Sequence, residues 1–138
     1  MVYSSYDKSR NLSQKKVVLK VIPDKEEVDR LFQEFYDKYL KGKNTLGMTK
    51  VIREKIKYKN VRGIDPVWTG LSTMSGSCFV HAEMLHKALD IAGIENYVIV
   101  AKGNTHSWVI AKENEKWRHY DPTPGKHDIG PLTDSEKT

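Results

Sequence analysis

The spacing of apolar residues changes once along this chain, at Gly93, and this change constrains the fold more than any other feature of the sequence. Before Gly93, apolar residues recur every three or four positions, which is the period of amphipathic helices. After Gly93, short segments rich in β-branched and aromatic residues alternate with turn residues, which is typical of strands. Helices followed by strands predict an α+β fold, with N-terminal helices packed on an antiparallel sheet.

The helical half begins with a clear start signal. Asp24 follows Pro23 and precedes Glu27 by three residues, a pattern close to a capping box. The helix behind it has one apolar and aromatic face, which we interpret as core, and Gly42 ends it. The residues of this face are Val28, Leu31, Phe32, Phe35, Tyr36, Tyr39 and Leu40. A short apolar run over residues 17–22 predicts a strand upstream that Pro23 ends.

Two more helices are predicted before the period changes. The first spans about residues 45–58, and the second begins at Cys78 and ends before Gly93, which is well placed as its C′ residue. The apolar face of the first consists of Met48, Val51, Ile52 and Ile56. Residues 59–77 contain three glycines, one proline and little periodicity, so we predict a long loop there. Loops of this length in small domains often carry function.

The length of the chain predicts one domain. A chain of 138 residues buries enough surface for one core but not for two independent ones. We divide it into a flexible arm over residues 1–15, a single domain over residues 16–131 and a tail over residues 132–138. No apolar run approaches the ~20 residues that span a bilayer, and residues 1–10 are too polar for a signal peptide, so we expect no membrane insertion. The sequence leaves open the compartment, the oligomeric state, and whether the chain is one domain of a larger secreted or surface protein.

The net charge of +5 is unevenly placed. Residues 1–62 hold 16 basic and 8 acidic residues, whereas residues 63–138 hold 7 and 10. A basic half can mark a nucleic-acid surface, but these lysines are mostly spaced singly along helical patterns, as on solvated faces, and no recognisable nucleic-acid motif accompanies them. We therefore expect no nucleic-acid partner.

The single cysteine, Cys78, excludes an internal disulfide and a structural metal site made of thiolates. A lone cysteine is usually a small buried hydrophobe, but this one is predicted at a helix N-terminus behind Ser75, Gly76 and Ser77. The helix dipole and free backbone N–H groups there favour a thiolate, and the same N–H groups could stabilise an oxyanion. A cysteine nucleophile also needs a base from elsewhere in the chain.

Five histidines are candidates for that base. His81 and His86 lie on the helix of Cys78, and we interpret both as polar surface residues. His127 lies in a segment rich in proline and glycine and carries no signal. The two remaining histidines, His106 and His119, lie in predicted strands.

Three strands are predicted, over residues 97–101, 106–111 and 116–120, and the last two suit a hairpin. A turn at Glu113 and Asn114 places His106 opposite Asp121 and Trp108 opposite His119, all on one face. A turn one residue later places Asp121 opposite Trp108 and diagonal to His106. Either register brings the His106 imidazole within reach of the Asp121 carboxylate, which would orient a catalytic histidine. Alternatively, Asp121 before Pro122 simply caps a turn.

These residues together carry a resemblance. Ser75-Gly-Ser-Cys78 entering a helix, then His106-Ser-Trp108-Val, Trp117 and Tyr120-Asp121-Pro-Thr123, resembles the transglutaminase-like superfamily, whose core is similar to papain-like cysteine proteases. The order Cys, His, Asp matches that family, with gaps of 28 and 15 residues, and the resemblance covers roughly residues 45–125. It implies a transglutaminase-like fold with the catalytic cysteine at a helix N-terminus, and a Cys78, His106, Asp121 triad.

The resemblance implies a cysteine-dependent acyl-transfer enzyme that acts on amide or peptide bonds of a protein or peptide substrate. We expect hydrolysis, as in a protease or amidase. The alternatives are a protein-crosslinking transglutaminase and a catalytically inactive interaction domain with the same fold. Further candidates for the oxyanion or substrate site are Trp68, Ser77 and Trp108, although a core role for Trp68 is equally plausible.

No cofactor is implied by the resemblance. The animal enzymes of the family are activated by calcium, but this chain has no cluster of alternating Asp and Asn around a glycine. We therefore expect no metal.

Overall fold

The computed structural model describes residues 23–126 and 128–137. The strand predicted at residues 17–22 lies outside the described residues, as does His127. The helices are α1 (Lys25–Phe35), α2 (Thr45–Lys55), α3 (Pro66–Thr73), α4 (Cys78–Ile91) and α5 (Asp134–Lys137). The strands are β1 (Lys57–Tyr58), β2 (Ser75–Gly76), β3 (Asn96–Val100), β4 (Ser107–Glu113) and β5 (Lys116–Tyr120).

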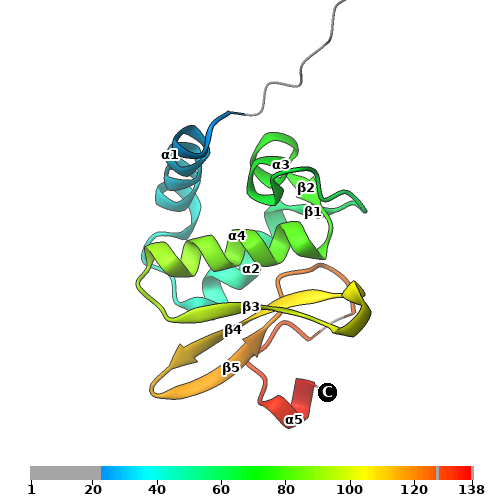
Figure 1. Cartoon of the computed structure of the whole chain (residues 1–138). Helices are drawn as coiled ribbons and strands as arrows, with labels where there is room; N and C mark the ends of the chain where they lie inside the picture. Colours follow the sequence, from blue (N-terminus) through cyan, green and yellow to red (C-terminus); the bar gives the residue numbers. More distant parts are fainter. Residues whose placement is uncertain (1–22, 127, 138) are drawn as a thin grey trace, which may run out of the picture.

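The molecule is arranged in layers around α4, which crosses its middle (Figure 1). The strands β3, β4 and β5 form an antiparallel sheet in that order, and α4 packs on one face of it. Helices α1 and α3 lie on the other side of α4, α2 packs along α4, and α5 lies on the face of the sheet turned away from α4. The predicted α+β fold, with N-terminal helices packed on an antiparallel sheet, is confirmed.

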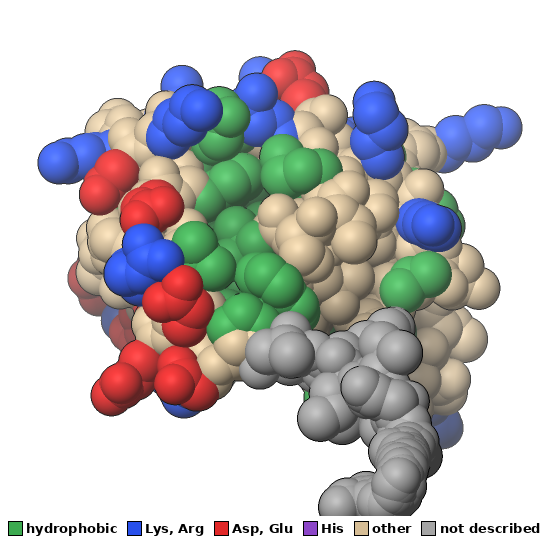
Figure 2. Space-filling model, turned by 90° about the horizontal axis from the view of Figure 1, so that it is seen from above, with side chains coloured by type: hydrophobic (Ala, Val, Ile, Leu, Met, Phe, Trp, Pro, Cys, Tyr) green, Lys and Arg blue, Asp and Glu red, His purple; other side chains and the backbone are tan. Residues whose placement is uncertain are grey.

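The first helix forms as its start signal predicts. The Asp24 side chain accepts a hydrogen bond from the Glu27 backbone N–H at 2.9 Å, which satisfies one of the free donors of the first turn. Val28, Phe32 and Phe35 are buried on the inner face. The helix continues through a π-helical segment, Tyr36–Leu40. Figure 2, which views the molecule from above Figure 1, shows apolar side chains gathered in the middle of this surface with charged side chains around them.

The second helix ends three residues earlier than the sequence predicts. It stops at Lys55, and Lys57 and Tyr58 form β1, which pairs in parallel with β2. The Lys57 N–H donates to the carbonyl of Met74 at 3.0 Å, so a bond to a distant segment replaces the next bond of the helix. Local propensity could not reveal this partner.

The predicted loop over residues 59–77 was wrong in its centre, where α3 forms. Asp65 is the N-cap of α3, and its carboxylate accepts from the Trp68 N–H at 3.1 Å. Pro66 occupies the first turn, where its missing N–H costs nothing. Asp65 and Pro66 are therefore a helix start signal, and the helix was not predicted because the residues that follow lack apolar periodicity.

Helix α4 was predicted correctly at both ends. It begins at Cys78, and Gly93 follows its last turn with a φ of +77°, a conformation that favours glycine. The core packs around α4, and its fully buried members include Phe32, Leu40, Met48, Ile52, Met84, Leu85, Leu89 and Val109.

His81 is a correction, because the structure buries it completely instead of placing it on the surface. Its ring nitrogens contact the carbonyls of Ser77 and Ile56 at 2.8 and 2.7 Å. The side chain therefore ties the first turn of α4 to the end of α2, and a buried polar group with two partners can be accommodated in the core.

The hairpin adopts the later of the two expected registers. Val109 pairs with Tyr120, and the turn lies at Asn114 and Glu115. Both turn residues have positive φ, 51° and 66°, as two-residue hairpin turns require, so the register with the turn at Glu113 and Asn114 was wrong. The inner face of the sheet carries Val109, Ala111 and Tyr120 against α4, and the opposite face carries Trp108, Trp117 and His119.

The segment after β5 returns to the sheet. Leu132 and His119 exchange backbone hydrogen bonds at 2.8 and 3.1 Å, and α5 follows. The boundary between domain and tail at residue 131 stays a prediction, although contacts with β5 continue beyond it. Within residues 23–126 and 128–137, no helix is both long and apolar enough to cross a membrane.

Candidate active site

Cys78 is the first residue of α4. The two residues before it, Gly76 and Ser77, are closely packed against Val80 and Val61. Ser77, the N-cap, is 4% exposed, and its N–H donates to the carbonyl of Val61 at 2.8 Å. A Cβ on Gly76 would lie 2.5 Å from the Cβ of Val80, so only glycine fits there. The chain is thus fixed just before Cys78, which is 7% exposed.

His106 and Asp121 lie at adjoining strand ends, directly before β4 and directly after β5. His106 Nε2 donates a hydrogen bond to Asp121 Oδ2 at 2.7 Å. A neutral ring with its proton on Nε2 keeps a lone pair on Nδ1, which can accept a proton. The hydrogen bond expected from the strand spacing is therefore present in the later register, with the two residues diagonal.

Asp121 is almost fully buried, at 1% exposure, and each of its polar groups has a partner. Its Oδ1 accepts from the Thr123 N–H at 3.0 Å, and Lys137 Nζ lies 3.3 Å from Oδ2. Its backbone carbonyl accepts from Arg53 of α2 at 3.1 Å. Both sequence interpretations hold, because the carboxylate caps a turn with one oxygen and binds His106 with the other.

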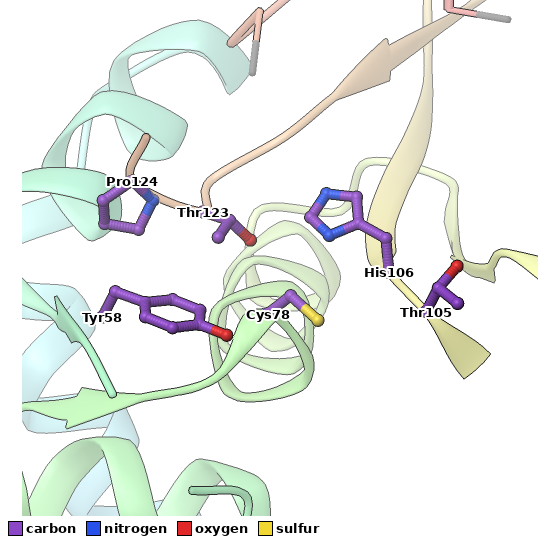
Figure 3. Close-up of a pocket in the computed structure, with 6 residues that line it drawn as sticks. All are labelled: Tyr58, Cys78, Thr105, His106, Thr123 and Pro124. Atoms are coloured by element: carbon purple, nitrogen blue, oxygen red, sulfur yellow. The ribbon is translucent and has the colours of Figure 1, made fainter. Parts of the chain in front are cut away.

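Cys78 and His106 line the same cleft, which has a volume of about 280 Å³. The other lining residues are Tyr58, Thr105, Thr123 and Pro124. In Figure 3 the sulfur of Cys78 is turned toward the side of the cleft where the His106 ring lies, and Tyr58 extends toward Cys78 from the opposite side. The fold therefore brings together a thiol from the first turn of α4 and an imidazole from the residue directly before β4.

The electrostatics of Cys78 differ from the expectation for a helix N-terminus. Burial raises the pKa of the thiol, and the negative charge of Asp121 raises it further. The backbone N–H groups of Ser107, Phe79 and Cys78 lower this pKa, but they do not outweigh burial. Thiolate formation at neutral pH therefore depends on a neighbouring group that takes the proton. The hydrogen bond from the Ser107 N–H, which lowers the pKa of Cys78, shows that the start of β4 lies next to the sulfur.

The carboxylate of Asp121 is held in its charged form. Burial by itself would raise the pKa of Asp121, but the hydrogen bonds from His106 and Thr123 and the charge of Lys137 together hold it below its usual value. A carboxylate can orient His106 and stabilise it when it is protonated.

This depressed pKa predicts a specific loss of stability in acid. A carboxyl whose pKa is lower in the folded state stabilises the fold above its unfolded pKa, about 3.9 for Asp, and the contribution disappears as the pH falls through the folded pKa. We expect Asp121→Asn to lower the free energy of unfolding by about 1–3 kcal/mol at neutral pH. This difference from wild type should shrink below about pH 4, as urea unfolding across a pH series would show.

The control for this series is Asp128→Asn, which removes an exposed carboxylate from the same region. A difference between wild type and Asp121→Asn that stays constant down to pH ~2 would contradict the prediction, since the Asp121 carboxyl would then titrate alike in both states.

Of the three further candidates for the oxyanion or substrate site, two lie next to a residue of the proposed triad and one does not line the cleft. Trp108 lies beside His106, with ring centroids 5.7 Å apart, and Ser77 precedes Cys78 with its hydroxyl buried. Trp68 lies on α3 and is not among the residues that line the cleft, so its candidacy for the oxyanion site is not supported. The cleft residue in its place is Tyr58, which sequence analysis missed because β1 was assigned to a helix.

No group of three or more His, Cys, Asp or Glu side chains in residues 23–126 and 128–137 is arranged to hold a metal ion. The expectation that the protein uses no metal stays a prediction.

Solved structures resemble this fold, among them the following two. One is a transglutaminase, "Crystal structure of a TGase", with a TM-score of 0.61 and 16% identity over 82% of this chain and 37% of that one. The other is a "Putative Cysteine Protease from Cytophaga hutchinsonii", with a TM-score of 0.53 and 17% identity over 74% of this chain and 40% of that one. The present chain thus spans less than half of either protein. No family model matches the sequence, and no curated protein matches it.

The fold is therefore similar to that of a transglutaminase and of a putative cysteine protease, in agreement with the transglutaminase-like fold that the sequence resemblance implied. At identities of 16% and 17% the likeness concerns the fold, and the chemistry must be argued from the side chains.

Proposed function

We propose that this protein is a cysteine-dependent acyl-transfer enzyme that acts on amide bonds of a protein or peptide substrate. The observation that carries the proposal is the cleft shared by Cys78 and by His106, whose ring is fixed to a buried carboxylate. A nucleophile, a base and a group that orients the base are the parts that covalent catalysis of acyl transfer needs. In this proposal Cys78, His106 and Asp121 are the catalytic triad.

In the first half of the reaction, Cys78 Sγ attacks the carbonyl carbon of the amide, and the thiol proton passes to His106 Nδ1. The C–N bond then breaks, the leaving amine takes the proton from His106, and a thioester remains on Cys78. In the second half, His106 takes a proton from water as the water oxygen attacks the thioester. The C–S bond breaks, the acid leaves, and the proton returns to the sulfur.

The negative oxygen that forms during each attack needs hydrogen-bond donors. The N–H groups of Cys78 and Phe79 in the first turn of α4 are available, since α4 leaves its first N–H groups without helical partners. The Tyr58 hydroxyl lines the same cleft and extends toward Cys78 (Figure 3). We propose these three groups as the oxyanion donors in place of Trp68.

We propose that water, and not an amine, resolves the thioester. A transferase must exclude water while it presents a deprotonated amine, which normally takes a covered channel. Tyr58, on one wall of the cleft, is 53% exposed, so the described residues leave that wall open to solvent. A crosslinking transglutaminase and an inactive interaction domain with this fold remain the alternatives that the experiment must separate.

The experiment offers a library of glutamine-containing peptides with and without a labelled primary amine, and compares wild type with Cys78→Ala. We expect peptide cleavage or deamidation that depends on Cys78 and exceeds amine incorporation. Amine incorporation that outpaces hydrolysis would assign the protein as a transglutaminase. Absence of turnover over a broad library would instead favour the interaction domain.

A further inference from the structure

Trp108 contacts the base of the proposed triad from a side that Asp121 does not cover. The Trp108 and His106 rings are inclined by 30° with their centroids 5.7 Å apart; Trp108 lies at the start of β4, and His106 directly precedes this strand. His106 is 19% exposed at its side chain, and its bond to Asp121 holds one edge of the ring. A ring held at one edge can still swing, so the surface of Trp108 restricts its orientation.

Trp108 is itself held by a hydrogen bond. Its Nε1–H donates to His119 Nδ1 at 2.8 Å. An indole N–H can only donate, so Nδ1 of His119 must be the acceptor and the neutral His119 ring carries its proton on Nε2. His119 Nε2 lies 2.7 Å from Asp134 Oδ1 of α5 and donates to it. The chain of contacts runs from Asp134 through His119 and Trp108 to His106.

Helix α5 makes a second contact with the same group of residues. Lys137 Nζ lies 4.5 Å from the centroid of the Trp108 ring and 3.3 Å from Asp121 Oδ2. The start of α5 is fixed by Thr133 and Glu136, whose side chains and backbone N–H groups bind each other at 2.8 and 3.3 Å. The segment after β5 therefore contacts both Trp108 and Asp121, which each contact the His106 ring.

We propose that Trp108 is a positioning residue that fixes the His106 ring in the orientation in which it binds Asp121, and that His119 and Asp134 hold Trp108 in place. The proposal rests on the role of His106 as the base in the proposed function. In this proposal His119 does not touch the substrate or the reacting atoms. It affects the reaction only by holding Trp108, which in turn orients the His106 ring.

The test compares four variants with wild type. Trp108→Leu removes the ring, and His119→Ala removes the acceptor for the indole N–H. His119→Asn keeps an acceptor oxygen near the position of Nδ1. Trp117→Leu is the matched control, because Trp117 lies on the same face of the sheet but stacks on Tyr97, at a centroid distance of 5.6 Å, away from His106.

Two readouts are measured for each variant. The first is the rate at which iodoacetamide alkylates Cys78 at about pH 6.5, where only an activated thiol reacts quickly. The second is the low-field proton NMR signal of the ring proton that His106 shares with Asp121, which reports the orientation of the ring whether or not the protein is an enzyme.

We expect Trp108→Leu and His119→Ala to lower the alkylation rate about tenfold, because a small misplacement of a catalytic group is costly, and to broaden or remove the low-field signal. His119→Asn should restore most of both readouts, and Trp117→Leu should change neither. If Trp108→Leu does not fold, Trp108→Phe replaces it, since phenylalanine keeps an aromatic ring, although a smaller one, and has no N–H to donate to His119.

An alkylation rate and a low-field signal that persist in His119→Ala would overturn the proposal, and so would equal losses in Trp117→Leu. If wild-type Cys78 reacts no faster than a free thiol, the proposed function fails, but the NMR signal across the same variants still decides whether Trp108 and His119 position His106.

Discussion

We expect Cys78→Ala to lower kcat/KM for the proposed amide hydrolysis by about 10⁴-fold or more, because Cys78 carries the only thiol among the residues that line the cleft. Cys78 is the single cysteine of the chain, so no second thiol can substitute for it. The variant loses the sulfur and keeps the fold, since alanine occupies less space at a site that is 7% exposed and at the first turn of a helix. Hydrolysis of the best peptide from the library, measured with matched enzyme concentrations, gives the ratio.

Cys78→Ser is the second variant of this test. It retains an attacking oxygen of nearly the same size, but a hydroxyl is far harder to deprotonate than a thiol, so we expect a loss close to that of Cys78→Ala. Thermal unfolding of all three proteins provides the control for folding. Turnover that survives in Cys78→Ala would rule out the thioester mechanism and would assign the hydrolysis to another group or to a contaminant.

If His106 is the base of the proposed triad, we expect His106→Ala to lower the same kcat/KM by about 10³- to 10⁴-fold and to change how the thiol responds to pH. Burial raises the pKa of Cys78, so without His106 the thiol is protonated at neutral pH and reacts slowly. In the proposed mechanism, His106 takes the thiol proton of Cys78, so we expect the wild-type thiol to react at lower pH than the variant does.

The measurement is the rate of Cys78 alkylation from about pH 5 to 10 in wild type and His106→Ala. The wild-type rate should persist well below pH ~8.5, the ordinary thiol pKa, whereas the variant should react only as the pH rises above that value. Identical profiles would show that His106 does not share a proton with Cys78. His119→Ala serves as the comparison, because it acts on His106 indirectly and should shift the rate far less than His106→Ala does.

The N-terminal helices show how far local sequence signals reach. Asp24 and Glu27 predicted the start of α1, and Gly93 predicted the end of α4, because caps act within one turn of the chain. The end of α2 was misplaced because Lys57 bonds to Met74, which lies 17 residues away. Asp65 and Pro66 form a helix start signal before α3. The helix was nevertheless not predicted, because its apolar residues do not form a clear amphipathic pattern.

The structure brings together the three residues that the sequence predicted for catalysis, and their catalytic role stays a prediction. The order and spacing of Cys78, His106 and Asp121 identified the residues that the structure brings to one region, because strand alternation restricts which side chains can meet. The correct register depended on the turn at Asn114 and Glu115, whose positive φ values the sequence did not single out. Tyr58 was not recognised, because its place in the cleft depends on the pairing of β1 with β2.

The sequence by itself determined the α+β class and the starts of α1 and α4, since caps, hydrophobic period and strand alternation are properties of neighbouring residues. The three residues proposed for catalysis came from their order in the chain together with the resemblance to the transglutaminase-like superfamily. Only the tertiary structure decided that burial raises the pKa of the Cys78 thiol, that the buried His81 ring joins α4 to the end of α2, and that His119 accepts a hydrogen bond from Trp108. These features depend on how much solvent is excluded at a point in space and on which distant groups lie within hydrogen-bond distance. Neither quantity can be read from residues adjacent in the chain.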